Sequence, residues 1–522
     1  MDPRLREGDN IVVLSNKKWL CDARITIFIA GTDDLYYNKA MLDDLINERR
    51  KKLAVMRAAK IDPYPRDAER THTAAEARAA FPKLEKGGGE VSLAGRLTGM
   101  RDQGNIAFLD LADESGKFQI VLKNGDLPQF ELWKSVLDIG DFISATGKLF
   151  KTKKGEESLA AAKFVMLSKS LRPVPSERFG VEDEELRLRK RYLDLLSNPQ
   201  EKELFRKKAA FWETFRGFLK KDGFLEVETP ALETIPGGAE AEPFKTHHRA
   251  LDTDFYLRIS LELPLKKLLV AGYEKVFEIG RIFRNEGIDR EHLQDYTQLE
   301  FYWAYHNYDD LMALVEKMYK EAIKNVCGGL TTEFQGKKID WSKQWPKVDY
   351  VEAFKKENKL DPAAATRDEL AKRAKELKLD FDKSAGKGRL IDLIYKKTVR
   401  PNLIEPCFLV DPPAEIEPLA KRSAKDPRVV ERMQVMACGT ELGKGFSELN
   451  DPADQRARFE EQEAARKAGD AEAQHLDEDF LEALEYGMPP AAGFGVSERL
   501  FAVLMDKPVR ETVIFPLMRP KK

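Results

Sequence analysis

Apolar and polar residues alternate on both sides of a charged loop between residues 276 and 305. Alternation with a period of two predicts two β-strands, because successive side chains of a strand point to opposite faces. The loop between them, Gly287 to Asp295, carries turn-forming and ionic residues, which predicts a hairpin. One face of the hairpin is apolar, and the other presents Glu278, Arg284, Glu286, Gln298, Glu300 and Tyr302.

This polar face has two interpretations. Several carboxylates beside a single arginine are typical of a site that holds a cation and an anion together. A structural sheet with one solvated face is the alternative, although such a face would carry scattered Lys, Thr and Ser. The concentration of carboxylates favours the first interpretation.

The N-terminal part of the chain contains two other periodic patterns. From Met41, apolar residues at near-helical spacing beside a dense charged face predict a helix that ends before Pro63. Between residues 88 and 172, about five short strands separated by Gly and Asp turns predict a small closed barrel of the OB type, a common platform for single-stranded nucleic acid. Phe108 and the lysine-rich run 148–157 would supply a stacking ring and a cationic rim, while a structural barrel with Phe108 in its core is the alternative.

Composition narrows the possible classes. The 522 residues are enough for two or three domains, and a net charge of -2 neither indicates nor excludes a nucleic-acid partner. The four cysteines form no C-x-x-C, which argues against a disulfide framework and a zinc site and favours a reducing, cytoplasmic location. No apolar run approaches the roughly 20 residues that span a bilayer, so no membrane association is predicted.

Three longer motifs follow one another along the chain. The first is G-F-L-E-V-E-T-P, ending at Pro230, and the second is F-R-N-E, from Phe283 to Glu286, with its loop and return strand. The third is a glycine run that closes at Glu498 and Arg499. The segments P-F-x-T-H-H, Y-L-R-I-S-x-E-L, G-F-S-E-L-N-D, A-L-E-Y-G-M-P-P and F-P-x-M-R-P accompany them. This ordered set resembles the class II aminoacyl-tRNA synthetases, specifically the lysyl-tRNA synthetases with an N-terminal OB domain.

The resemblance implies an α+β protein with an OB-type β-barrel and a catalytic domain built on an antiparallel sheet flanked by helices. The implied organisation is an extension at 1–40 outside the resemblance, a helical segment at 41–87, an anticodon-binding OB fold at 88–172, a linker and helix at 173–200, and a catalytic domain at 201–522 with a mostly helical insertion at about 331–400. It further implies a homodimer that associates through the motif-one region.

The resemblance also implies roles for individual residues. Activation would be the attack of the lysine carboxylate on the α-phosphate of ATP, so it needs positioning and charge neutralisation. Arg284 and Arg499 would be catalytic, with Arg284 at the carboxylate and α-phosphate and Arg499 at the γ-phosphate. The other implied ATP contacts are Glu286, His292, Tyr296 and Glu441.

Lysine would be bound by Gly238, Glu262, Arg284, Glu300, Tyr302, Lys444, Phe446 and Glu448, with Glu262 facing the α-ammonium and Glu300, Tyr302 and Glu448 the side-chain ammonium. The implied Mg²⁺ ligands are Glu441, Glu448 and Gln434. Phe108 and Glu156 would read the anticodon of tRNA(Lys).

Four features depart from the family pattern. Gln434 stands where a third metal-binding Glu is usual, Lys444 where an Asn is usual and Glu242 where an Arg is usual, and motif three is one residue shorter than usual. An ammonium at position 444 would either pair with a substrate carboxylate or repel lysine. The alternatives to a lysine–tRNA ligase are therefore a paralogue that charges another amino acid or lysylates a protein, and a tRNA-binding paralogue with weakened catalysis.

Overall fold

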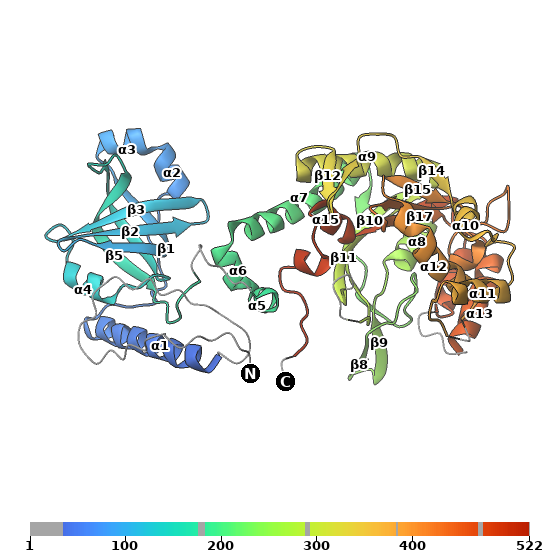
Figure 1. Cartoon of the computed structure of the whole chain (residues 1–522), viewed down its shortest axis with the longest axis horizontal. Coiled ribbons are helices and arrows are strands. Elements are labelled where there is room, and N and C mark those ends of the chain that lie inside the picture. The colour runs from blue at the N-terminus through green and yellow to red at the C-terminus, as the bar shows by residue number, and fades with distance from the viewer. Residues whose placement is uncertain (1–34, 176–182, 288–292, 383–384, 468–472, 521–522) are drawn as a thin grey trace, which may run out of the picture. The chain divides into compact units, whose positions relative to one another are not determined.

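The structure is a computed structural model that describes residues 35–175, 183–287, 293–382, 385–467 and 473–520. It separates into two compact units, one built on a closed barrel and one on a large sheet (Figure 1). No helix within the described ranges is both long and apolar enough to cross a membrane. The extension up to Asp34 lies outside the described residues.

The first unit is a five-stranded closed barrel with strand order β1-β2-β3-β5-β4 (Figure 1), which confirms the expected OB-type fold. The elements are α1 (Leu35–Ala58), α2 (Ala74–Ala79), α3 (Phe81–Gly87), β1 (Glu90–Asp102), β2 (Ile106–Asp113), β3 (Gly116–Lys123), α4 (Phe130–Val136), β4 (Phe142–Lys151) and β5 (Glu157–Ser168). Helix α1 begins six residues before the predicted start at Met41.

Strand parity decides the position of Phe108. On β2, Ala107 and Leu109 are fully buried in the barrel core, so the intervening Phe108 points outward and is only partly buried. The alternative that placed Phe108 in the barrel core is therefore wrong. Glu156 lies exposed just before β5 in the same unit.

The second unit contains an eight-stranded sheet of order β14-β15-β16-β17-β18-β11-β10-β6. Its strands are β6 (Leu225–Glu226), β10 (Lys275–Phe283), β11 (Asp295–Ala304), β14 (Lys347–Asp349), β15 (Cys407–Val410), β16 (Arg432–Ala437), β17 (Thr440–Ser447) and β18 (Ala491–Ser497). The six central strands are antiparallel as expected, whereas both edge strands, β6 and β14, pair in parallel. A small sheet of β7 (Leu232–Glu233), β9 (Thr253–Leu257) and β8 (Lys245–His248) lies in the same unit.

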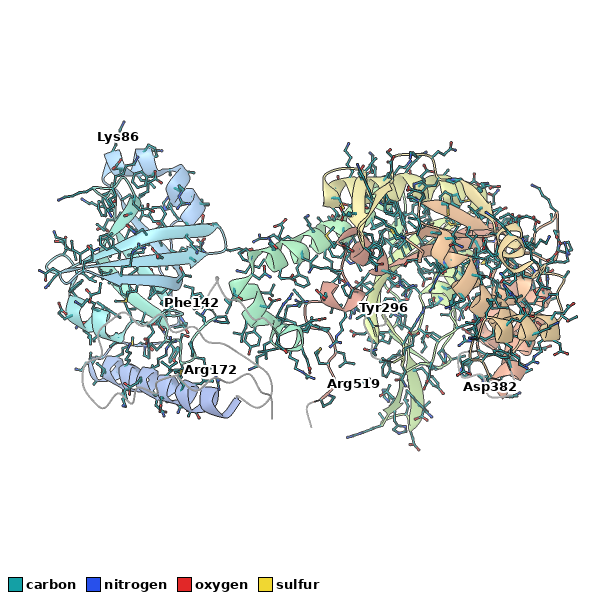
Figure 2. All side chains as sticks on the ribbon, viewed as in Figure 1. Lys86, Phe142, Arg172, Tyr296, Asp382 and Arg519 are labelled. Carbon is teal, nitrogen blue, oxygen red and sulfur yellow. The ribbon has the colours of Figure 1, made fainter. Side chains whose placement is uncertain are left out.

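Helices α7 (Pro199–Lys221) and α9 (Tyr308–Cys327) share the main core with the apolar face of the large sheet. Helix α9 has strong end signals, because Asn307 forms a capping box and Gly328, with a φ of 76°, ends it in the left-handed conformation. Phe277, Leu299 and Phe301 lie in this core, which confirms the predicted apolar face of the hairpin. The opposite face of the sheet carries Tyr296 (Figure 2) and the polar residues of the pocket described below.

Helix α15 (Arg499–Leu504) also belongs to this core, through Leu500, Phe501, Val503 and Leu504. The remaining helices lie outside it, namely α5 (Glu184–Arg189), α6 (Arg191–Ser197), α8 (Glu262–Val270), α10 (Tyr350–Asn358), α11 (Arg367–Glu376), α12 (Lys387–Thr398), α13 (Pro452–Lys467) and α14 (Glu478–Glu485). The expected helical insertion contains α10, α11 and α12. It also contains the hairpin β12 (Thr331–Phe334) and β13 (Lys337–Asp340), so it is less purely helical than predicted.

Candidate active site

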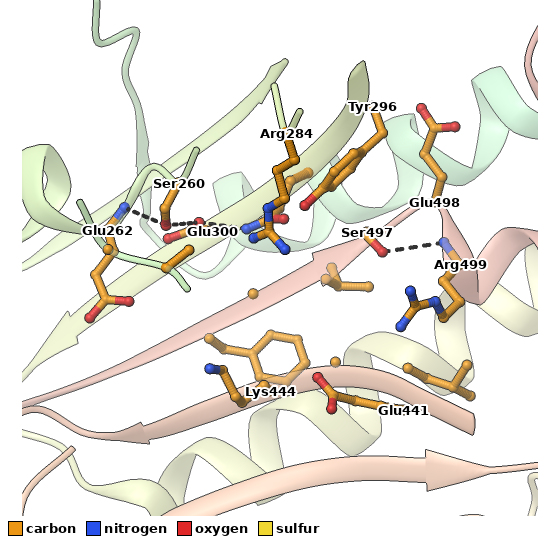
Figure 3. Close-up of a pocket in the computed structure, with 18 of the residues that line it drawn as sticks. Ser260, Glu262, Arg284, Tyr296, Glu300, Glu441, Lys444, Ser497, Glu498 and Arg499 are labelled. Carbon is orange, nitrogen blue, oxygen red and sulfur yellow. Dashed lines mark hydrogen bonds between the residues drawn. The ribbon is translucent and has the colours of Figure 1, made fainter. Parts of the chain in front are cut away.

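The polar face of the sheet opens into a pocket of about 230 Å³ (Figure 3). Its walls come from β11, β17 and β18, from the chain after β10 and from the start of α8, so segments distant in sequence meet there. The predicted site residues that line it are Gly238, Glu262, Arg284, Glu286, Tyr296, Glu300, Tyr302, Glu441, Lys444, Phe446 and Arg499.

One end of the pocket is organised around the Glu300 carboxylate. Its Oε1 atom accepts from the Ser260 hydroxyl at 2.9 Å, the Leu261 backbone N–H at 3.0 Å and the Gln298 amide at 2.6 Å. Its Oε2 atom accepts from the Tyr302 hydroxyl at 2.9 Å. A carboxylate offers about four acceptor positions, and these donors fix Glu300 while Oε2 keeps capacity for one more.

A buried lysine lies at the same end. Lys266 Nζ is 2.8 Å from Glu262 Oε1, one turn away on α8, and 2.5 Å from Glu448 Oε2. Burial opposes its charge, but the two neighbouring carboxyl groups raise the pKa of Lys266, so it stays an ammonium. Burial also raises the pKa of Glu262 to about 7 and the pKa of Glu448 well above its ordinary value.

The glycine run on β18 allows side chains to converge on this end. Gly493 pairs with Tyr302 in the ladder, and a Cβ at Gly493 would lie 2.3 Å from both Glu448 Oε1 and the Tyr302 ring. Any side chain at this position would therefore displace both groups. Gly495 pairs with Glu300 and Ser497 pairs with Gln298, which fixes the register of the shortened motif.

The other end of the pocket is rich in cations. Arg284 follows β10, and its Nε and Nη2 atoms donate to the Ile259 carbonyl at 3.4 Å. Its guanidinium carbon lies 5.6 Å from the centre of the Tyr296 ring. Figure 3 shows Arg284 and Arg499 entering the pocket from different walls, with Tyr296 beside them. The planar guanidinium of Arg284, with its fixed set of N–H donors, and the second arginine are suited to binding a polyanion.

A bulge in β17 places two charged residues on the same face. Glu441 and Lys444 are three residues apart, so regular alternation would point them to opposite faces. The register shifts between Val435 and Met436 of β16, which pair with Gly443 and Glu441 respectively. Because one residue of β17 is extra at this point, both Glu441 and Lys444 line the pocket (Figure 3).

The predicted metal ligands do not form one common donor set. Gln434 Nε2 donates to Glu441 Oε2 at 2.6 Å, while Gln434 Oε1 accepts from Arg432 at 3.0 Å. The amide thus presents N–H rather than oxygen toward Glu441, and Glu448 pairs with Lys266. Within the described ranges, no group of three His, Cys, Asp or Glu side chains could hold a metal ion. The donor set therefore does not fit a divalent ion held by three protein ligands.

One expectation about the polar face needs correction. Glu278 does not line the pocket, because its carboxylate accepts from the Thr229 backbone N–H and hydroxyl and pairs with Arg258 at 2.7 Å. Glu242, which stands where an Arg is usual, lies outside the lining, and its backbone and side-chain oxygens accept from Asn285. Glu278 thus links β10 to the end of motif one, and Glu242 supports motif two at Asn285.

Three other predicted residues are not part of the described pocket. His292 lies outside the described residues, and Phe108 and Glu156 belong to the barrel unit. Sequence reasoning in turn missed the roles of Ser260, Lys266 and Glu417. Only Lys266 had a local signal, because it lies four residues after Glu262, the spacing of neighbours on a helix face.

Comparison with known proteins gives a consistent result. A family described as tRNA synthetases class II (D, K and N) matches residues 183–519, and one described as an OB-fold nucleic acid binding domain matches residues 91–167. A lysine–tRNA ligase of Moorella thermoacetica is 45% identical over 485 residues, which cover 92% of this chain and 99% of that protein. Lysine–tRNA ligases of Pelotomaculum thermopropionicum and Roseiflexus castenholzii are each 45% identical over 92% of this chain, covering 96% and 100% of those proteins.

Proposed function

The chain belongs to the class II tRNA synthetases (D, K and N) and is a lysine–tRNA ligase, and from this premise we propose which part of the pocket binds each substrate. Its substrates are lysine, ATP and tRNA. In the proposed division, the acidic end around Glu300 binds the amino acid, and the cationic end around Arg284 binds the nucleotide. The reacting atoms then meet between the two ends.

The observation that carries this proposal is the excess of carboxyl groups at the amino-acid end. Glu262 and Glu448 flank the ammonium of Lys266, and Glu300 lines the same pocket, so the carboxyl groups outnumber the one ammonium among them. Free lysine brings two ammonium groups. Glu262 faces the α-ammonium, whereas Glu300, Tyr302 and Glu448 face the side-chain ammonium, with Phe446 and Gly238 shaping the wall.

At the other end, a carboxylate oxygen of lysine attacks the α-phosphorus of ATP, and the bond to pyrophosphate breaks. No proton has to move in this step, so the contribution of the protein is orientation and charge stabilisation. Arg284 binds the carboxylate and the α-phosphate, Arg499 binds the γ-phosphate, and Glu286 and Tyr296 contact adenine. The adenylate then transfers lysine to a hydroxyl of the 3′-terminal ribose of tRNA, and AMP leaves.

Members of this family use ATP with a divalent metal. We propose that the metal is Mg²⁺ and that it is carried mainly by the phosphate oxygens of ATP, because Mg²⁺ commonly binds substrate phosphates with only one or two carboxylates. Of the three predicted metal ligands, Glu441 is the one that lines the pocket and would contact it. The amide of Gln434 and the carboxylate of Glu448 have other partners.

The barrel is proposed to be the anticodon-binding domain, at about residues 88–172, and residues 201–522 the catalytic domain. The outward position of Phe108 supports stacking on an anticodon base, and the exposed Glu156 is available to contact it. A cytoplasmic location is proposed because charged tRNA is consumed there by translation.

A homodimer through the motif-one region is also proposed. Three leucines that follow α7 are largely exposed, Leu225 at 47%, Leu232 at 46% and Leu251 at 62%, which suits burial against a second copy. Light scattering at micromolar concentration should give twice the chain mass of 59.5 kDa. A mass of one chain under these conditions would contradict the proposal.

Lysine-dependent exchange of pyrophosphate into ATP tests the assigned chemistry without tRNA. Exchange should saturate with lysine and be much weaker with ornithine, although one methylene gives only about 1–3 kcal/mol of discrimination. Exchange with another amino acid instead would indicate a paralogue of different specificity. Exchange with none would favour a tRNA-binding paralogue whose catalysis is lost.

A further inference from the structure

A buried network holds one lysine of the pocket wall, Lys444, in place. Lys444 Nζ donates to Glu417 Oε2 at 2.8 Å, and the same oxygen accepts from Arg432 at 3.3 Å. Arg432 also donates to Gln434, which donates to Glu441. A continuous chain of hydrogen bonds therefore runs from Lys444 to Glu441, and both of its end residues line the pocket.

The direction of this chain is fixed by chemistry. Arg432 has only N–H donors, so Gln434 must turn its carbonyl oxygen to Arg432 and its amide N–H to Glu441. Gln434 then offers no oxygen beside Glu441 for a cation. Glu417, which is 4% exposed, has Lys444 and Arg432 as its partners and is itself screened from the pocket.

The number of charges in the network also argues against a divalent ion held there. Two acids, Glu417 and Glu441, face two bases, Arg432 and Lys444, so the network has no surplus negative charge to attract a divalent ion. Of the two bases, Lys444 is the one that lines the pocket, with 41% of its side chain exposed. Burial works against its charge, but Glu417 raises the pKa of Lys444, so the ammonium persists at neutral pH.

We propose that the ammonium of Lys444, positioned by Glu417, supplies the positive charge near the reacting carboxylate and α-phosphate. In this role it replaces a metal ion held by the protein. This inference rests on the proposed function of the pocket. Figure 3 shows Lys444 and Arg284 entering from opposite walls, so the carboxylate of lysine and the α-phosphate of ATP lie between an ammonium and a guanidinium.

The first experiment removes the ammonium. Lys444→Met should lower kcat/KM for lysine-dependent pyrophosphate exchange about 100-fold, the effect of removing one preorganised donor to a developing charge. Lys421→Met is the matched control, because the exposed Lys421 ammonium donates to Asn450 outside the pocket lining, and it should leave exchange unchanged. Thermal melting checks that Lys444→Met is folded. Glu417 is not left without a counter-ion in this variant, because Arg432 remains its partner. The double variant Lys444→Met/Glu417→Gln, which removes both charges of the pair, should show the same loss.

The second experiment measures metal binding without ATP, with Mn²⁺ alone as the probe and electron paramagnetic resonance as the readout. The wild-type protein should bind no Mn²⁺ with a Kd in the micromolar range. Gln434→Glu/Lys444→Asn adds a carboxylate beside Glu441 and removes the ammonium, so it should gain one such site. Stoichiometric micromolar binding by the wild type, or full exchange activity in a folded Lys444→Met, would overturn the inference. Absence of lysine-dependent exchange in the wild type would instead overturn the proposed function.

Discussion

Lys266 and Lys444 are each held against a buried glutamate, and their ammonium groups lie 5.6 and 5.9 Å from the centre of the same Phe446 ring. Lys266 is enclosed by Glu262 and Glu448, so one ammonium is shared by two acids. For Lys444 the ratio is reversed, because Glu417 is one acid shared by Lys444 and Arg432. The number of partners, rather than the residue type, decides whether a lysine leaves the pocket acidic or basic.

This difference matters for the proposed binding of a ligand with two ammonium groups beside a polyanion. Lys266 relieves repulsion among carboxyl groups that would otherwise be costly to bury together. Glu417 holds Lys444 in place while part of the Lys444 side chain stays exposed in the pocket. In the proposed arrangement, lysine is oriented with its carboxylate toward the nucleotide.

The largest effect should come from breaking the basic end at Arg284. Arg284→Ala should lower kcat/KM for pyrophosphate exchange about 1,000-fold, or ~4 kcal/mol, because the Arg284 guanidinium is proposed to bind the lysine carboxylate and the α-phosphate. Arg428→Ala is the control, since the exposed Arg428 pairs with Asp426 at 2.6 Å and does not line the pocket. A loss of less than tenfold in Arg284→Ala would place the reacting atoms elsewhere.

The acidic end should be the next most sensitive. Glu300→Gln keeps the size of the side chain but removes its charge, and should raise KM for lysine about 100-fold, or ~2.7 kcal/mol. KM for ATP should stay within about twofold of the wild type, because the nucleotide binds at the other end. Steady-state exchange kinetics give both constants. Equal increases in both would show that the two ends are not separable.

A change in the barrel should affect neither end of the pocket. Phe108→Ala should raise KM for tRNA in the charging reaction about 30-fold, or ~2 kcal/mol, the loss of one stacked base. Pyrophosphate exchange should be unchanged. Phe142→Ala, which removes another exposed ring of the barrel, is the control. An unaltered KM for tRNA would remove Phe108 from the proposed anticodon contact.

The smallest effect expected is a pH dependence confined to the acidic end. Burial raises the pKa of Glu262 to about 7, so the carboxylate that faces the α-ammonium is lost as the pH falls through that value. KM for lysine should therefore be about tenfold higher at pH 6 than at pH 8, while KM for ATP changes little. Glu262→Gln should flatten this profile. A wild-type profile that is already flat would contradict the assignment.

Much of the fold could be predicted from the sequence. The alternation on both strands of the hairpin correctly separated the apolar face of Phe277, Leu299 and Phe301 from the polar face. The barrel was predicted for the same reason, because periodicity is a local property of the chain. Parallel pairing of the edge strands β6 and β14 had no local signal, since it depends on how distant segments meet.

The sequence by itself determined which chemical groups are available, because the motifs contain the arginines, carboxylates and phenols that the reaction needs. Only the tertiary structure decided what those groups contact. The bulge in β17 turned Glu441 and Lys444 to one face, and long-range ion pairs gave Lys266 to Glu448 and Lys444 to Glu417. The physical reason is that the charge and role of a buried group depend on its neighbours in space, which local sequence patterns do not specify.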